Sequence, residues 1–342
     1  MSSEKYGTID SENLKLSVVI TAFNRTEFLP MAIRSVFQQE GNHLRLEVIV
    51  VSNCDFPIDG IPNKINFRKI IMDGTVGDFL SEAIQSAEGD IIAFLDDDDI
   101  WTCGKIQRLL YAFSDIRVVF YHNMYTYIDS QGNPLKYTRK VEKKNSEAFK
   151  SQLIFNSASR PEQLREAIER KADFNLSCIA VRRSFALEYV DALKMITSAP
   201  DGFFFWTAAI SQSDLFIDNL ILTHYRVHRL NISHSRSVED KAKELWKEIK
   251  TFELLVSLVE EREVITNLRV SIKKWLQLYY NEYMLILLTL TKNNKILILK
   301  SIASIWKTGF GIRNTLKYRI TGFGLLSVFN RRLTWFLYDH LE

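Results

Sequence analysis

The N-terminal part of the chain alternates between two kinds of hydrophobic pattern. Short runs of β-branched and aliphatic residues predict buried strands over residues 16–20, 46–51 and 91–95. Between these runs, apolar residues recur at helical spacing within residues 28–39 and 80–87. Strand and helix patterns in alternation are typical of βαβ units. We therefore predict the α/β class, with a mostly parallel central sheet flanked by helices.

The C-terminal part has a different pattern. From residue 238 onward the strand patterns disappear, and apolar residues at helical spacing predict helices over 245–259 and 268–290. The last stretch, residues 292–342, has nine Lys and Arg residues against two acids, which leaves +7, interleaved with aromatic residues. The predicted organisation is an N-terminal tail, an α/β domain and an all-helical C-terminal region, at residues 1–14, 15–237 and 238–342.

The basic C-terminal stretch has two interpretations. Basic and aromatic residues together are typical of helices that lie on an anionic membrane surface. The alternative is a helical subdomain that packs on the α/β domain or on a second subunit of a homo-oligomer. Both a peripheral membrane role and an oligomer stay open at this point.

Composition is ordinary for a globular protein of 342 residues, with 46% hydrophobic and 25% charged residues. A net charge of +3 gives no indication of nucleic-acid binding. The three cysteines lack metal-ligand spacing and favour a reducing compartment. Neither a signal peptide nor an apolar stretch of the roughly 20 residues that span a bilayer is visible. We expect a cytoplasmic protein, peripheral at most on the cytoplasmic face of the cell membrane.

Candidate chemistry is concentrated after the third predicted strand, where four consecutive aspartates cover Asp96 to Asp99. Ligands of open α/β sheets bind at the carboxyl ends of the strands, and residues 21–25 and 52–55 are expected at the same edge. Adjacent carboxylates repel one another, and a hard divalent cation with oxygen ligands relieves that repulsion while bridging to substrate phosphates. A solvated acidic turn is the alternative. The lack of GxGxxG and GxxxxGK[ST] sequences argues against a dinucleotide-binding or P-loop domain.

Three segments carry a resemblance to a known family. They are VVITAFNR at 18–25, AEGDIIAFLDDDDIW at 87–101 and HYRVH at 224–228, the last followed by Asn231 and Ser233. In this order they resemble the family-2 glycosyltransferases, which have the GT-A fold of nucleotide-diphospho-sugar transferases. The resemblance covers residues 15–235, and the ordered set is specific although each segment alone is not.

The resemblance implies sites for a divalent cation and for the donor nucleotide. Asp96 and Asp98 stand at the acids of a DxD motif, which holds Mg²⁺ or Mn²⁺ against a diphosphate. The implied metal-binding residues are Asp96, Asp98, Asp99 and His228. The implied donor-binding residues are Thr21, Phe23, Asn24, Arg25, Asn53, Asp96 and Asp97. A core aromatic is the alternative for Phe23 and a structural histidine for His228, while Arg226 is expected either on the diphosphate or at the sheet edge.

The resemblance also implies a base that removes the proton of the acceptor hydroxyl. Such a base contributes about 10² to 10⁴ to the rate. Asp201, in the segment APDGFFFW at 199–206, is the best match, and Asp191 is the second choice. A helix N-cap before residues 202–210 is the alternative for Asp201, although a capping carboxylate can also be catalytic.

Together these residues imply a metal-dependent inverting glycosyltransferase, which moves a sugar from a nucleotide-sugar donor to a glycan or lipid-linked acceptor hydroxyl. Two departures from the family pattern oppose this. Ser52-Asn53 replaces an Asp-Asp pair after the second strand. Phe79-Leu80-Ser81 lacks the usual arginine, whose charge Arg25, Lys69 or Arg182-Arg183 would have to supply.

These departures support an alternative from another class, a non-catalytic nucleotide-sugar-binding or scaffolding subunit of a glycan-assembly complex. A sugar-phosphate nucleotidylyltransferase fits less well, because it needs a Gly-rich loop after the first strand and residues 21–25 contain no glycine. Retention of the metal acids, Asp201 and His228 favours an active transferase.

Overall fold

The computed structural model describes residue 10 and residues 13–39, 45–57, 66–135, 151–228 and 238–262, with scattered positions between 264 and 277. The chain divides into two compact units, Met1–Arg229 and Leu230–Glu342. Asn231, Ser233, most of the predicted helix over 268–290 and the whole basic stretch 292–342 lie outside the described residues.

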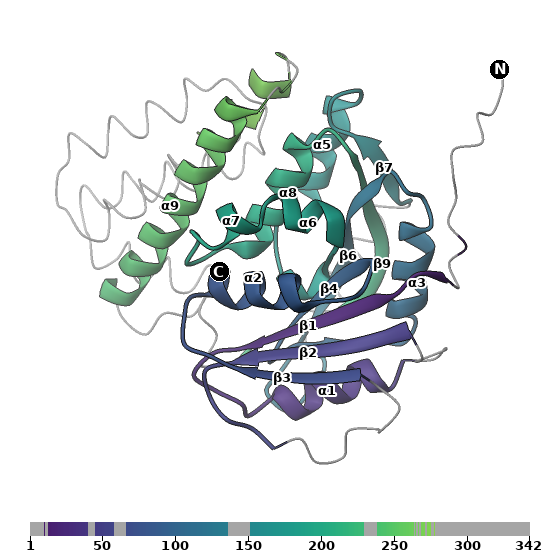
Figure 1. The fold of residues 1–342 in the computed structure, drawn as a ribbon, viewed down its shortest axis with the longest axis vertical. Helices are drawn as coiled ribbons and strands as arrows, with labels where there is room; N and C mark the ends of the chain where they lie inside the picture. The colour runs from purple at the N-terminus through teal and green to yellow at the C-terminus, as the bar shows by residue number, and fades with distance from the viewer. Residues whose placement is uncertain are drawn as a thin grey trace. The chain divides into compact units, whose positions relative to one another are not determined.

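The first unit is built on one mixed sheet (Figure 1). Its described strands are β1 (Leu16–Ala22), β2 (Leu46–Ser52), β3 (Asn66–Ile71), β4 (Ile91–Asp96), β5 (Ile100–Trp101), β6 (Val118–Ile128), β7 (Leu153–Asn156), β8 (Ile179–Arg182) and β9 (Asp214–Arg226). They lie in the order β3-β2-β1-β4-β8-β6-β9-β5, and β7 pairs with β9. The strands β3, β2, β1 and β4 are mutually parallel, which confirms the pattern predicted from the first hundred residues.

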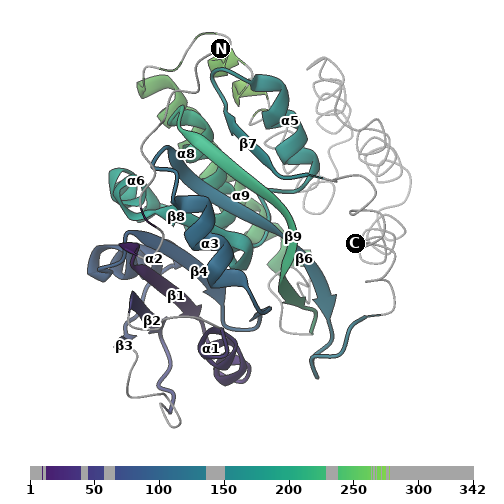
Figure 2. The same ribbon diagram turned by 90° about the vertical axis from the view of Figure 1, so that its right-hand side faces the viewer.

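The other half of the sheet contains an antiparallel strand that the alternating pattern did not predict. This strand, β8, pairs antiparallel with both β4 and β6, so β4 and β6 run in the same direction. β9 is parallel to β6, and the two strands lie side by side in Figure 2. The carboxyl ends of β1, β2, β4, β6 and β9 consequently lie at the same edge of the sheet.

Helices cover both faces of the sheet (Figures 1 and 2). One face carries α1 (Leu29–Phe37) and α3 (Lys105–Phe113), whose apolar residues share a core with β1, β2 and β4. The opposite face carries α2 (Val76–Ser86), α6 (Arg183–Glu188), α7 (Val190–Leu193) and α8 (Pro200–Ile210). There Phe204 of α8 stacks on Phe94 of β4, with ring centroids 4.7 Å apart. A further helix, α5 (Pro161–Glu169), follows β7, and the 3₁₀ turn η3 (Leu176–Cys178) precedes β8.

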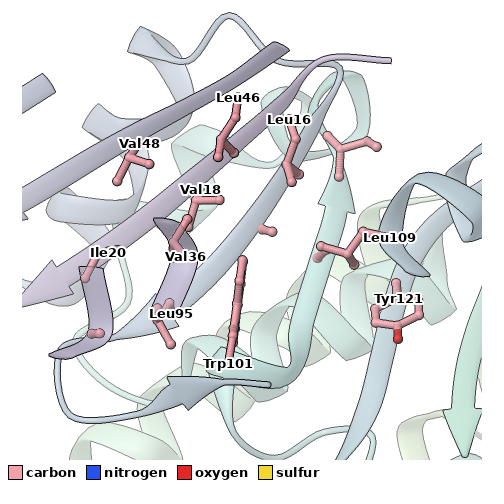
Figure 3. Close-up of a cluster of buried hydrophobic side chains, with 14 of the residues drawn as sticks. Leu16, Val18, Ile20, Val36, Leu46, Val48, Leu95, Trp101, Leu109 and Tyr121 are labelled. Atoms are coloured by element: carbon pink, nitrogen blue, oxygen red, sulfur yellow. The ribbon is translucent and has the colours of Figure 1, made fainter. Parts of the chain in front are cut away.

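The core under α1 and α3 fixes the position of the strands that end at the site (Figure 3). Val18 of β1, Leu95 of β4 and Val36 of α1 are fully buried in it. Because β1 and β4 are covered on both faces, their residues are buried on both sides and mostly apolar, with Ser17 as a buried polar residue of β1. Their parallel register sets Thr21 directly beside Asp96 at the carboxyl edge.

The second unit contains α9 (Val238–Glu261). Ile249, Phe252, Leu255 and Val259 are buried along this helix, at the spacing of one helical face. This confirms the helix predicted over 245–259, although Val256 of the predicted apolar stripe is only partly buried and Leu255 is buried instead. Within the described part of the chain, no helix combines the length and the apolar character needed to cross a membrane.

Candidate active site

The loops after β1 and β2 meet at the carboxyl edge, as the sequence predicted. The backbone N–H of Asn24 donates to Oδ1 of Asn53 over 2.8 Å, and Nδ2 of Asn53 donates back to Oδ1 of Asn24 over 2.7 Å. Asn24 has a left-handed backbone, with φ of 58°, a conformation that asparagine tolerates better than most residues. The two amides therefore hold the two loops in a fixed relation.

Phe23 lies on the exposed side of this junction. Its side chain is 48% exposed, so the alternative of a core aromatic is wrong. The ring is backed by Phe79 of α2, with centroids 6.0 Å apart. A supported ring with an open face can stack on a planar ligand, and aromatic rings provide such platforms for nucleobases. Thr21, at the end of β1, is partly buried nearby.

Asp96 ends β4 and is partly buried, while the three aspartates that follow it are buried rather than solvated, so the alternative of a solvated acidic turn is wrong. Asp97, Asp98 and Asp99 are 4%, 5% and 0% exposed. Burial raises the pKa of Asp97 to about 6, although the Arg25 ion pair opposes it. Burial and the charge of Asp98 raise the pKa of Asp99 to about 8. Burial and the neighbouring carboxylates raise the pKa of Asp96 well above its ordinary value.

Arg25 is the cation that faces these acids. Its guanidinium donates to both oxygens of Asp97, over 2.8 and 3.0 Å, and also pairs with Asp98. Lys69 instead pairs with Asp55. Arg182 donates to backbone carbonyls, those of Phe113, Asp115 and Val118. Of the three candidates to replace the family's missing arginine, Arg25 is the one in contact with the aspartates.

Asp98 and His228 meet from distant parts of the chain. Nε2 of His228 lies 3.0 Å from Oδ2 of Asp98, although 130 positions separate the two residues. Oδ2 of Asp98 also pairs with Arg25, so the histidine and the arginine contact the same carboxylate oxygen. Mg²⁺ prefers oxygen ligands, commonly takes only one or two carboxylates and receives further oxygens from substrate phosphates. The Asp98 carboxylate therefore fits a cation that is shared with a diphosphate, whereas the imidazole of His228 contacts Asp98 itself in this structure.

The other two predicted metal residues have different partners. Oδ1 of Asp99 accepts from the backbone N–H of Arg226 over 2.9 Å. The hydroxyl of Ser177 accepts from the backbone N–H of Asp96 over 3.0 Å and lies 3.4 Å from its carboxylate. Over the described residues, no group of three or more His, Cys, Asp or Glu side chains is gathered as a metal cage.

Arg226 binds the protein itself rather than an exposed ligand site. It is fully buried, and its guanidinium donates to the backbone carbonyls of Asp98, Asp129 and Ser130 over 2.7, 3.0 and 3.1 Å. Arg226 was expected either on the diphosphate or at the sheet edge, and the structure shows it at the sheet edge. Arg226 thus connects the end of β9 to the aspartate turn and to the end of β6.

Asp201 lies in the first turn of α8. The N-cap of this helix is Ala199, with φ of 55°, and Pro200 is its first residue, so the N-cap alternative for Asp201 is wrong. Its two carboxylate oxygens accept from the backbone N–H groups of Asn175 and Gly202, each over 2.9 Å. Burial raises the pKa of Asp201 to about 6. Its charge also contributes to the raised pKa of Asp96, so the two acids are neighbours in space.

The second choice for a base lies elsewhere. Asp191 is exposed on α7, and no described hydrogen bond or ion pair joins it to the four aspartates. Two residues that sequence reasoning missed, Asn175 and Ser177, connect Asp201 to Asp96. Asn175 has φ of 69° and accepts from the backbone N–H of Ser177 over 2.8 Å. The tolerance of asparagine for this conformation was the only local signal.

The chain belongs to glycosyl transferase family 2, whose family model matches residues 17–190. An uncharacterized glycosyltransferase of Nostoc is 31% identical over 118 residues, which are 32% of this chain and 36% of that protein. A candidate teichuronic acid biosynthesis glycosyltransferase of Bacillus subtilis, TuaG, is 25% identical over 130 residues, 35% of this chain and 50% of the relative. The alignments thus span half or less of these curated relatives.

Solved structures share the fold at low sequence identity. TarS of S. aureus, residues 1–349 in complex with UDP-GlcNAc, has a TM-score of 0.60 and 12% identity, covering 96% of this chain and 93% of that one. The mannosyltransferase PcManGT of Pyrobaculum calidifontis, in complex with GDP-Man and Mn²⁺, has a TM-score of 0.53 and 11% identity, with 98% and 88% covered. The family and its GT-A fold, both expected from the sequence, are confirmed.

Proposed function

We propose that this protein transfers a sugar from a nucleotide-sugar donor to an acceptor hydroxyl, with inversion at the anomeric carbon. One observation carries the proposal: a supported aromatic ring at Phe23, the Asp98–His228 pair and the partly buried Asp201 of α8 are gathered around one sheet edge. Sugar transfer needs a platform for the nucleobase, a site for the diphosphate and a base for the acceptor, and these groups have those properties.

In the proposed reaction, Asp201 takes the proton of the acceptor hydroxyl as its oxygen attacks the anomeric carbon. A carbon–oxygen bond forms on the face opposite the diphosphate. The bond from the anomeric carbon to the diphosphate breaks, and its electron pair leaves on the nucleoside diphosphate. The N–H groups of Asn175 and Gly202 hold the Asp201 carboxylate in one orientation. A pKa of about 6 leaves it ionised at neutral pH and closer to the operating pH than an ordinary carboxylate.

The leaving diphosphate would bind on the other side of the site. Asp98 and His228 would hold the divalent cation, with Asp96 and Asp99 beside them, and a bound cation supplies a Lewis acid for the leaving charge. Arg25 adds a fixed positive charge next to Asp98. Thr21, Phe23, Asn24 and Asn53 would contact the nucleoside. Asp97 would act through Arg25, because it holds the guanidinium through both carboxylate oxygens.

The setting we propose is the assembly of a cell-surface glycan on a membrane lipid, at the cytoplasmic face of the membrane. The name of the B. subtilis relative supports a surface polysaccharide. The basic and aromatic composition of residues 292–342 supports contact with an anionic lipid surface.

Thermal unfolding of the full chain with nucleotides tests the donor site. The panel is UDP, GDP, UDP-GlcNAc and GDP-Man, each with and without Mn²⁺. Ligand at a hundredfold excess over its Kd stabilises the folded state by about 2.7 kcal/mol. We expect one nucleotide to raise the Tm only when Mn²⁺ is present. Asp98→Ala should abolish this shift, while the control Asp115→Ala, at a surface pair with Arg117, should retain it.

Donor hydrolysis in the absence of an acceptor then separates the enzyme from the scaffold alternative. Release of nucleoside diphosphate that requires Mn²⁺ and Asp201 supports a transferase. Binding without any such release, for the sugar-nucleotide that gives the Tm shift, would favour a non-catalytic nucleotide-sugar-binding subunit. If none of the nucleotides shifts the Tm, both the transferase and the nucleotide-sugar-binding subunit are contradicted.

A further inference from the structure

Four aromatic side chains form a contiguous cluster at the ends of β6 and β9, and neither the donor nor the base uses them. They are Tyr125, Tyr127, Phe174 and Tyr225, and we call them the aromatic platform. The ring of Tyr125 lies 5.5 Å from the rings of Tyr127 and Phe174 and 6.1 Å from that of Tyr225. Tyr225 lies 5.8 Å from both Tyr127 and Phe174. Tilted and edge-on contacts at these distances are favourable and fix the rings relative to one another.

The platform is partly open to solvent. Tyr125 is buried at its centre, whereas Tyr127, Phe174 and Tyr225 are of intermediate exposure. Lys171 lies over one of the rings, with Nζ 5.5 Å from the centroid of Phe174. Large aromatic side chains that stay partly exposed lose part of the burial that would stabilise them in a core. A ring cluster of this kind, at the carboxyl edge of a sheet, is suited to a ligand with an apolar face.

Two of these rings are one residue away from a group that holds an active-site carboxylate. Phe174 precedes Asn175, whose backbone N–H donates to Asp201 over 2.9 Å. Tyr225 precedes Arg226, whose backbone N–H donates to Asp99 over 2.9 Å. Successive Cα atoms are about 3.8 Å apart. The platform therefore adjoins the candidate base on one side and the aspartate turn on the other.

We propose that the aromatic platform binds a pyranose ring of the acceptor and presents a hydroxyl of that ring to Asp201, an inference that rests on the proposed function. A pyranose has an apolar face of C–H groups and a rim of hydroxyls. Tyrosine has the matching combination of an apolar ring and a polar end. The acceptor class is therefore a carbohydrate rather than a bare lipid alcohol, and a lipid carrier would be reached through a sugar already attached to it.

Saturation-transfer NMR on the full chain tests binding without any need for turnover. The probes are the methyl pyranosides of glucose, galactose, mannose and N-acetylglucosamine, each measured without nucleotide and again with Mn²⁺ and any nucleotide that gives the Tm shift. Sorbitol, an acyclic polyol with similar hydroxyls, is the control probe. We expect saturation of the ring C–H protons of at least one pyranoside and none of sorbitol.

Substitutions assign that signal to the platform. Tyr127→Leu and Phe174→Leu remove a ring while keeping an apolar side chain, and each should weaken pyranoside binding about tenfold, equivalent to about 1.4 kcal/mol. The ratio of sugar transfer to donor hydrolysis should fall by a similar factor. Tyr127→Phe keeps the ring and should retain most of the signal. Tyr111→Leu removes an exposed ring on α3 and should change neither measurement.

Two results would overturn the proposal. One is a protein that binds its donor but saturates none of the four pyranosides, or saturates sorbitol equally. The other is an unchanged signal in both leucine variants. A chain that binds pyranosides through the platform but gives no donor-dependent Tm shift would instead contradict the proposed function and leave the sugar site standing.

Discussion

The two sides of the candidate site are built in different ways. The nucleotide edge, which we define as Phe23, Asn24 and Asn53, is exposed or only partly buried, and its hydrogen bonds join two neighbouring loops. The acid cluster, defined as Asp96–Asp99 with Asp201, is held by groups from distant parts of the chain. Arg226 reaches Asp99 across 127 positions, and Ser177 reaches Asp96 across 81.

Because the two sides differ in this way, substitutions on each side should have different effects. On the exposed nucleotide edge, a substitution changes contacts with a ligand and disturbs little else. In the acid cluster, burial raises the pKa of Asp97, Asp99 and Asp201. Two of the residues that hold this cluster, Ser177 and Arg226, are themselves fully buried. Substitutions there should change the rate or the free energy of unfolding. The comparison can be tested by one change at a time on each side.

The largest expected effect is on the acid side, at the proposed base. Asp201→Asn keeps the shape of the side chain but cannot accept a proton. We expect kcat for sugar transfer to fall by about 10² to 10⁴, while the donor-dependent Tm shift is retained. Initial rates at saturating donor measure the change, and Asp191→Asn is the matched control. A full loss of transfer in Asp191→Asn with full activity in Asp201→Asn would assign the base to α7.

The next effect is on folding. Arg226→Met removes the donor of the buried carbonyl of Asp98, and an unsatisfied buried group costs about 1 to 3 kcal/mol. It also removes the donors of the partly buried carbonyls of Asp129 and Ser130, of which that of Asp129 still accepts from the N–H of Gly132. We therefore expect the free energy of unfolding to fall by about 1 to 3 kcal/mol. Urea denaturation measures it. The side chain of Arg117 is 44% exposed in its ion pair with Asp115, so Arg117→Met should lower the free energy of unfolding by at most about 1 kcal/mol. Equal losses in the two variants would contradict the difference between buried and exposed contacts.

The sequence was sufficient to predict the parallel strands β1, β2 and β4 and the meeting of the loops that follow them. The strands that end at Ala22, Ser52 and Asp96 were recognisable because each is short and mostly apolar and is followed closely by polar residues. Their parallel alternation with helices implied the shared edge, and the structure brings Asn24 to Asn53 and Arg25 to Asp97 there.

The contacts between residues far apart in the sequence were not predictable in the same way. β8 has only four residues, and its antiparallel position between β4 and β6 follows from tertiary packing rather than from alternation. Asn175 and Ser177 act through one backbone N–H and one hydroxyl, and neither leaves a pattern in the sequence. Even Asp201 was assigned by resemblance, and its place inside α8 depended on the helix beginning at Pro200.

On the nucleotide edge we expect a change in donor binding alone. Stacking of a base on an aromatic ring contributes about 1 to 3 kcal/mol by alanine substitution. Phe23→Ala should therefore weaken donor binding about 5- to 150-fold and leave the free energy of unfolding nearly unchanged. Titration calorimetry with the donor measures it. Phe23→Trp should retain binding, and Ile116→Ala, another exposed apolar residue, should have no effect. A lower free energy of unfolding with unaltered donor binding would mean that the ring of Phe23 serves to pack against Phe79 rather than to bind the donor.

The smallest effect, and the one that connects both sides, is pH dependence. Asp201 must be ionised to accept a proton, so transfer should fall about tenfold per pH unit below its pKa of about 6. Because this pKa is raised above the ordinary value of about 3.9, the folded state favours the protonated form. The stabilising contribution of the group is therefore complete below pH of about 4 and is lost as pH rises through about 6, by at most about 3 kcal/mol.

Activity and stability should thus change in opposite directions between pH 4 and pH 6.5, as far as Asp201 is concerned. The difference in unfolding free energy between the protein and Asp201→Asn reports the ionisation of Asp201 together with its effect on the pKa of Asp96, because Asp97 and Asp99 titrate in both. The nucleotide edge has no group that titrates in this range, so base recognition should not follow the same curve. A difference that stays flat with pH would mean that Asp201 is ionised throughout, and its burial would then have to be balanced by Asn175 and Gly202 alone.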